Sequence, residues 1–133
     1  MLWITALAAA ILAFLHVWLS LNVIRLRQTL KVVIGDGGHE ELIRAIRAQG
    51  NLAEYAPIGL ILLACLEWNG APWWLTAPLA LAFVSGRLLH PQGIRSAAAP
   101  WRPRVLGMQL TLVSLLALGA ANVVAVGLAL VIG

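Results

Sequence analysis

A row of polar side chains recurs at helical spacing within an otherwise apolar stretch of the chain. Its members lie three or four residues apart and therefore share one face of a helix. The row consists of Glu40, Arg44, Arg47, Asn51 and Glu54. Two readings remain open. The row forms a binding site, or it forms an internal network in which Arg44 or Arg47 pairs with Glu54 and holds helices together.

More basic side chains are expected at the same level as this row. They stand at the ends of three other apolar segments and are Arg25, Arg27, Arg87, His90, Arg102 and Arg104. A cationic rim above an acid and an amide suits a small anionic ligand with carboxylates, because arginine binds a carboxylate through two parallel hydrogen bonds. Each arginine taken singly is equally explained as a membrane-orientation signal.

The sequence gives little support for a reactive cysteine, a metal site or a nucleic-acid-binding site. The single cysteine, Cys65, lies in an apolar run and is expected to serve packing rather than to act as a nucleophile. His16, His39 and His90 are far apart and lack the spacing of metal ligands, so no metal site is expected. The net charge of +4 comes from basic residues that flank apolar runs, so no nucleic-acid binding is expected.

The composition indicates whether these side chains belong to a soluble protein or to a membrane protein. Of the 133 residues, 62% are hydrophobic and 11% are charged, whereas a soluble domain carries roughly 25% charged residues. A soluble fold of this size could not bury so much apolar surface. The chain is therefore expected to be an all-α integral membrane protein, a single domain over residues 1–133.

Four apolar segments are each long enough to cross a bilayer, which takes roughly 20 residues. They run over about residues 2–24, 43–68, 72–90 and 105–132. The first is not a signal peptide, because no basic residue precedes it and its apolar run is too long. Pro103 suits the first turn of the fourth helix, where its missing N–H costs nothing.

The basic residues predict the orientation of this four-helix bundle. All nine lysines and arginines fall at the first and third connections, and none falls in the turn between the second and third segments. By the positive-inside rule the first and third connections are cytoplasmic and both termini lie on the other side. Trp68, Trp73 and Trp74 cluster at the opposite boundary, as an aromatic belt does.

The polar row also resembles a known family. Residues 47–57, Arg-Ala-Gln-Gly-Asn-Leu-Ala-Glu-Tyr-Ala-Pro, are similar to the Arg-Ala-x-x-Asn-x-x-Glu-Tyr-x-Pro signature of the membrane-associated proteins in eicosanoid and glutathione metabolism (MAPEG). Gly86-Arg87-Leu88-Leu89-His90 provides a second, weaker match. The four-segment plan agrees along essentially the whole chain, which looks closest to the short bacterial members and so to a protein of the bacterial inner membrane.

The resemblance implies a homotrimer that binds glutathione between neighbouring subunits, near the cytoplasmic boundary. Carried over by position, the glutathione ligands are Arg47, Asn51, Glu54, Tyr55 and His90, with Arg87, Arg44 and Arg27 (or Arg25) at the rim. An arginine at the start of the fourth helix stabilises the thiolate, and either Arg102 or Arg104 fits that role. The family's eukaryotic synthases carry a further tyrosine in the region where this chain has Ile94.

The function implied is a membrane glutathione-dependent transferase or peroxidase that acts on hydrophobic electrophiles or lipid hydroperoxides. The alternative within the same superfamily is a non-catalytic lipid-binding or scaffold protein. A third reading is a small four-helix drug exporter, which needs a membrane-embedded carboxylate. Only Glu54 and Glu67 are candidates for that carboxylate, and both lie in the second segment rather than the first.

Overall fold

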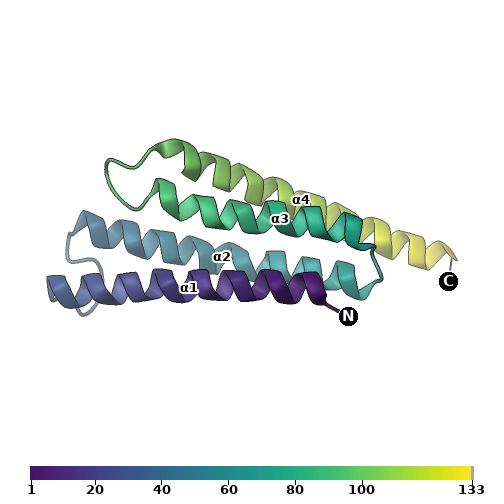
Figure 1. The fold of residues 1–133 in the computed structure, drawn as a ribbon, viewed down its shortest axis with the longest axis horizontal. Helices are drawn as coiled ribbons and strands as arrows, with labels where there is room; N and C mark the ends of the chain where they lie inside the picture. The colour runs from purple at the N-terminus through teal and green to yellow at the C-terminus, as the bar shows by residue number, and fades with distance from the viewer. Residues whose placement is uncertain (133) are drawn as a thin grey trace.

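The computed structural model describes residues 1–132 as an all-α fold of four long helices. The helices are α1 (Trp3–Leu30), α2 (Glu40–Trp68), α3 (Trp73–Leu89) and α4 (Trp101–Ile132), and a short 3₁₀ helix, η1 (His90–Gly93), follows α3. They run alternately up and down, so that both termini lie at the same end (Figure 1). The predicted four-helix architecture is confirmed.

Three of these helices, α1, α2 and α4, are long and apolar enough to cross a membrane. The remaining predicted span, residues 72–90, corresponds to α3, which has 17 residues and is therefore roughly 25 Å long at about 1.5 Å per residue. A bilayer core is about 30 Å thick, so α3 alone falls short of it. The chain continues from α3 directly into η1.

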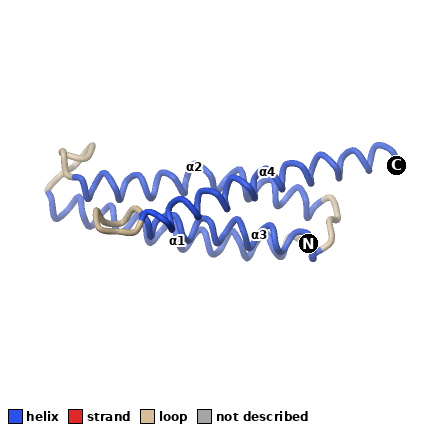
Figure 2. Tube along the Cα trace, turned by 90° about the horizontal axis from the view of Figure 1, so that it is seen from above, coloured by secondary structure: helices blue, strands red, loops and turns tan. Residues whose placement is uncertain are grey.

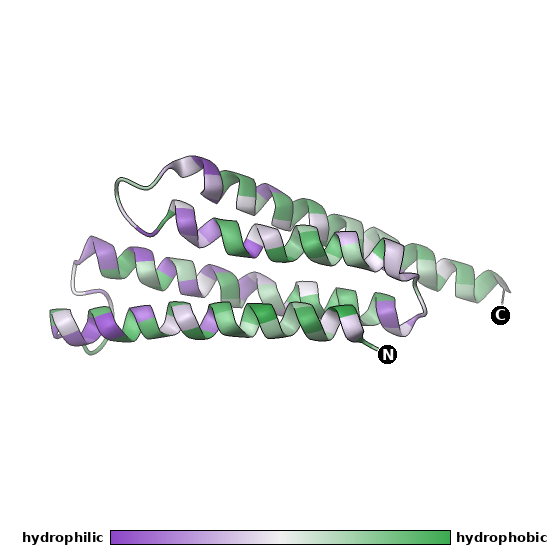
Figure 3. Ribbon diagram, viewed as in Figure 1, coloured by the Kyte–Doolittle hydropathy of each residue, from purple (hydrophilic) through white to green (hydrophobic). Residues whose placement is uncertain are grey.

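The helices extend beyond the predicted apolar segments at one end of the bundle. α1 continues through Arg25 and Arg27 to Leu30, α2 already begins at Glu40, and α4 begins at Trp101, with Pro103 in its first turn as predicted. Hydrophilic residues gather around these extensions and the two connections beside them (Figure 3). We call this the basic end, and the end with the termini and the α2–α3 turn the opposite end.

The outer surface of the bundle is apolar. Large side chains such as Phe14, Leu81 and Leu116 are 76%, 69% and 75% exposed, which lipid tolerates and water does not. At the opposite end Trp3, Trp68, Trp73 and Trp74 are all exposed, as the predicted aromatic belt requires.

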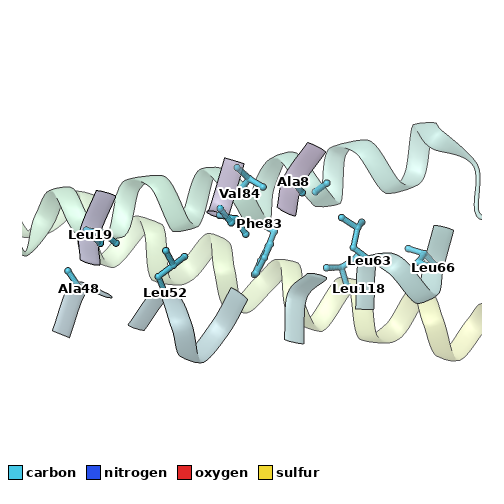
Figure 4. Packing of buried hydrophobic residues seen from close by; sticks show 11 residues of the cluster. Ala8, Leu19, Ala48, Leu52, Leu63, Leu66, Phe83, Val84 and Leu118 are labelled. Carbon is cyan, nitrogen blue, oxygen red and sulfur yellow. The ribbon is translucent and has the colours of Figure 1, made fainter. Parts of the chain in front are cut away.

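Inside the bundle a narrow apolar core joins all four helices. Leu19 of α1, Leu63 of α2, Phe83 of α3 and Leu118 of α4 belong to one buried cluster (Figure 4). Gly59 lets α2 approach α3 closely at this cluster, because a Cβ at this position would clash with the ring of Phe83. The loops stay outside this core and connect the helices at both ends (Figure 2).

A carboxylate closes the bundle at the opposite end. Glu67 accepts hydrogen bonds from the backbone N–H groups of Ile4 (3.1 Å) and Thr5 (2.7 Å) and from the Thr5 hydroxyl (2.6 Å). The first backbone N–H groups of a helix have no partner within it and carry its positive dipole end, so an acid from a neighbouring helix is a strong cap there. Glu67 thus links α1 to α2, which speaks against Glu67 as the free carboxylate that proton-coupled export needs.

Candidate functional site

A groove opens at the basic end between α2, η1 and α4. Its volume is about 500 Å³. The lining combines apolar and polar side chains: Asn51, His90, Trp101, Arg104, Val105, Met108, Gln109 and Leu112. We call it the basic-end groove. Of the predicted site residues it brings together Asn51 of α2, His90 of η1 and Arg104 of α4.

Arg87 lies directly behind this groove and is only 1% exposed. Its Nε–H donates to Oγ1 of Thr111 at 2.8 Å, and one terminal nitrogen donates to Oδ1 of Asn51 at 2.8 Å. The other terminal nitrogen reaches Sδ of Met108 at 3.9 Å. Its guanidinium carbon lies 5.1 Å from the centre of the Tyr55 ring, in cation–π contact. Arg87 therefore fixes side chains from α2 and α4 at once.

The buried guanidinium has no acidic partner among the residues that the structure describes. The ion pair found there joins Arg44 to Glu40 at 2.9 Å and does not involve Arg87. Burying a cation without an anion is costly, and neutral acceptors offset only part of that cost. A positive charge is thus held immediately behind the groove, where it attracts an anion. Since it is covered, Arg87 serves as a positioning residue for Asn51 and Tyr55.

Two glycines allow α3 and α4 to approach closely enough for this network. A Cβ at Gly86 would lie 2.8 Å from the carbonyl oxygen of Gly107, and a Cβ at Gly107 would lie 2.7 Å from the carbonyl oxygen of Gly86. Thr111 is one turn beyond Gly107 and donates its own hydroxyl to that residue's carbonyl at 2.8 Å. The hydroxyl oxygen is thereby oriented to accept from Arg87.

His90 opens η1, just beyond the end of α3, and is 6% exposed. Burial, followed by the positive charges of Arg87 and Arg104, lowers the pKa of His90 to about 4. The imidazole is therefore neutral at physiological pH. It contributes a hydrogen-bonding group to the groove and no charge.

The structure separates the two arginines that the sequence left as alternatives. Arg104 lines the groove, whereas Arg102, which is also exposed, is not part of the lining. Gly93 seats η1 against the first turns of α4, because a Cβ there would lie 2.4 Å from the backbone nitrogen of Arg104. The connector thereby places Arg104 next to His90.

Arg47 and Glu54 are exposed and lie outside the groove lining. Glu54 stands midway along α2 (Glu40–Trp68), and Arg47 is two turns nearer the basic end on the same face. The internal network considered above, in which Glu54 pairs with Arg44 or Arg47, is not formed within residues 1–132, since Arg44 pairs with Glu40. This face of α2 carries a carboxylate that lipid cannot solvate.

Arg44 and Arg27 lie apart from the groove. Arg44 lines a second hollow, between α1, α2 and η1. Arg27 donates to the carbonyl oxygens of Gly35 at 2.8 Å and Val33 at 3.4 Å, and so holds the α1–α2 connection. Within one chain the structure does not bring these two arginines to Asn51.

Six residues of the site, all on α4, were not predicted from the sequence. Thr111 and Met108 bind Arg87, and Trp101, Val105, Gln109 and Leu112 line the groove together with Met108. A signal was present for two of them: Arg104, Met108 and Thr111 recur at spacings of four and three and share one face of α4.

Comparison with known proteins agrees with the features of the bundle. The model of the MAPEG family matches residues 5–124. Inner membrane protein YecN of Escherichia coli, from strain K12 and from the O6:H1 strain CFT073, is 39% identical over 119 residues, which cover 90% of this chain and 89% of YecN.

Proposed function

Because the chain belongs to the MAPEG family, we propose that it is a glutathione-dependent transferase or peroxidase of the inner membrane. Its substrates are hydrophobic electrophiles or lipid hydroperoxides that enter from the bilayer. Some members of this family are glutathione transferases. The observation that carries the proposal is the basic-end groove, with Arg104, His90 and Asn51 in its wall and the buried cation of Arg87 behind it.

The donors of the groove fit glutathione, a peptide with two carboxylates and one thiol. Arg104 offers a forked donor for an anionic group, and the amide of Asn51 can donate because its oxygen is occupied by Arg87. Trp101, Val105 and Leu112 provide an apolar wall beside these donors. Such a mixture of a few polar groups in an apolar pocket is typical of small-molecule sites.

Glutathione supplies the nucleophile, a thiol with a pKa of roughly 8.5 that is mostly protonated at neutral pH. The guanidinium of Arg104 would favour the thiolate, and the covered charge of Arg87 adds to this effect in a setting partly shielded from water. In transfer, the sulfur bonds to the electrophilic carbon and the leaving group departs with its electron pair. In reduction, a hydroperoxide and two glutathiones give an alcohol, water and glutathione disulfide.

The proposal includes a homotrimer, with Arg47 and Glu54 completing the site against a neighbouring subunit. What favours assembly is the position of Glu54, exposed at the middle of a helix long and apolar enough to span the membrane. A charge there is expected to face protein or a water-filled cavity. Contact with a second subunit provides such an environment and would bring Glu54 and its neighbour Tyr55 to a ligand held between the subunits.

The test is glutathione binding to the detergent-purified protein, followed by the ultraviolet absorbance of the thiolate. Arg104→Ala should abolish the thiolate signal, whereas Arg102→Ala, which removes the same charge one half-turn away, should retain it. Lys31→Ala controls for the loss of one positive charge at the basic end. Conjugation and hydroperoxide-reduction assays then follow. Glutathione binding without turnover would favour the non-catalytic alternative, and no binding at millimolar glutathione would refute the proposal.

A further inference from the structure

A second hollow at the basic end lies between α1, α2 and η1, on a different side from the groove. Its volume is about 210 Å³. The lining residues are Trp18, Leu19, Asn22, Arg25, Leu26, Glu41, Arg44, Ala45, Ala48, Pro91 and Arg95. We call it the α1–α2 cleft. His90 lines the basic-end groove, and the next residue, Pro91, lines this cleft. The groove and the cleft therefore lie on two sides of η1 and α2, both of which contribute residues to each.

The cleft carries a net positive charge. Three arginines from three segments converge on it: Arg25 of α1, Arg44 of α2 and Arg95 of the α3–α4 connection. Glu41 is the one acid in the lining. Arg44 pairs with Glu40, outside the lining, and Arg25 makes a long contact of 3.4 Å with Asn22. The lining residues alone carry a net charge of +2, and counting Glu40 leaves one positive unit to attract an anion.

One donor in the cleft lacks a partner. The Nε–H of Arg44 is covered from water and has no acceptor, and it is the only side-chain polar atom of this kind among the residues that the structure describes. An unpaired buried donor is costly. Arg44 gains an acceptor if an anion enters the cleft and the guanidinium turns toward it.

Most of the remaining lining is apolar. It includes Leu19 and Leu26 of α1, Ala45 and Ala48 of α2, and Trp18. Trp18 lies seven residues before Arg25, which places it roughly 10 Å deeper along α1 at about 1.5 Å per residue. A cationic mouth above an apolar wall matches a phosphate group attached to a hydrocarbon chain.

We propose that the α1–α2 cleft binds the phosphate headgroup of an anionic glycerophospholipid, with Arg25, Arg44 and Arg95 on the phosphate and an acyl chain along Trp18 and Leu19. Basic pockets between helices at a membrane surface are typical sites for anionic headgroups. Glu41 disfavours a second negative charge at the rim and so sets the strength of binding. The proposal does not depend on glutathione binding in the groove.

The experiment is native mass spectrometry of the detergent-purified full chain, titrated with phosphatidylglycerol and, separately, with phosphatidylcholine. Phosphatidylglycerol should bind more tightly. Replacing Arg44 and Arg95 together by Gln should weaken its binding roughly tenfold or more, whereas Lys31→Ala, which removes a basic residue outside the cleft, should change it little. Glu41→Gln should strengthen binding about twofold to threefold, a gain that misfolding cannot produce.

Two results would overturn the proposal. Equal binding of the two lipids, unchanged in the variants, would mean that the cleft does not select an anion. If millimolar inorganic phosphate displaces phosphatidylglycerol and Leu19→Asn has no effect on lipid binding, the cleft is a site for free phosphate and not for a lipid.

Discussion

The two ends of the bundle differ in how the charge of a side chain is compensated. At the opposite end Glu67 accepts three hydrogen bonds from the start of α1, so groups of the same chain stabilise its negative charge. At the basic end Arg87 is 1% exposed and binds only neutral groups, beside an open groove. The first arrangement is closed and structural. The second leaves an excess of positive charge at a place that a small anion can reach.

The comparison gives a criterion for distinguishing structural from functional charges in a membrane bundle. A charge that is paired with a helix terminus contributes to packing and needs nothing more. A charge that is buried without its opposite, next to a cavity with free donors, indicates a binding site. Substitutions at the two ends should therefore affect different properties, stability at one and ligand binding at the other.

The largest effect is expected for Arg87→Met, which keeps the apolar stem and removes the guanidinium. Hydrogen bonds from a charged group contribute roughly 1.5–3 kcal/mol each. Loss of those to Asn51 and Thr111 should free both side chains and weaken glutathione binding about 100-fold. The measurement is the glutathione dissociation constant from the thiolate absorbance.

Arg87→Lys separates charge from geometry, because it keeps the positive charge but not the fork that joins α2 to α4. It should recover only part of the binding. Full binding in Arg87→Met, in a protein of unchanged helix content by circular dichroism, would show that the buried cation has no role at the groove.

At the opposite end Glu67→Gln should lower stability and leave glutathione binding unchanged. A carboxylate that caps a helix in a partly buried setting contributes about 1–2 kcal/mol, so the thermal midpoint in detergent should fall by roughly 3–6 °C. Thr5→Val removes one of the three hydrogen bonds and should have a smaller effect. If Glu67→Gln instead weakens glutathione binding while the midpoint is unchanged, the assignment of the two ends is wrong.

Much of the fold followed from apolar segment lengths and terminator residues. The four helices, the turn between the second and third segments, and Pro103 in the first turn of α4 were all predicted. The helix ends were not, because α1 and α2 continue past their apolar segments into the basic end. Hydropathy indicates which residues can lie in lipid. It does not indicate at which residue the backbone hydrogen bonding of a helix ends.

The site was only partly predictable. Helical spacing placed Asn51 and Glu54 on one side of α2, but Asn51 turns to the groove and Glu54 stays exposed. Periodicity gives the direction of a side chain on its own helix and does not say which neighbour it meets. The role of Arg87 depends on the close crossing of Gly86 and Gly107, which are 21 residues apart in sequence and meet only through tertiary packing.

The smallest effect is expected for substitution of His90, which lies in the groove wall beyond the end of α3. Its pKa is lowered to about 4, against about 6.5 in an unfolded chain. The unfolded chain therefore binds the proton more readily, so stability is full above about pH 6.5 and declines as the pH falls toward 4. His90→Gln removes this titration and keeps a hydrogen-bonding group.

The difference in thermal midpoint between pH 7.5 and pH 4.5 should therefore be smaller in His90→Gln than in the wild type. The thiolate titration of bound glutathione should show no inflection near pH 6.5 in either protein. An inflection that His90→Gln removes would mean that the imidazole is charged in the groove and acts on the ligand as a cation.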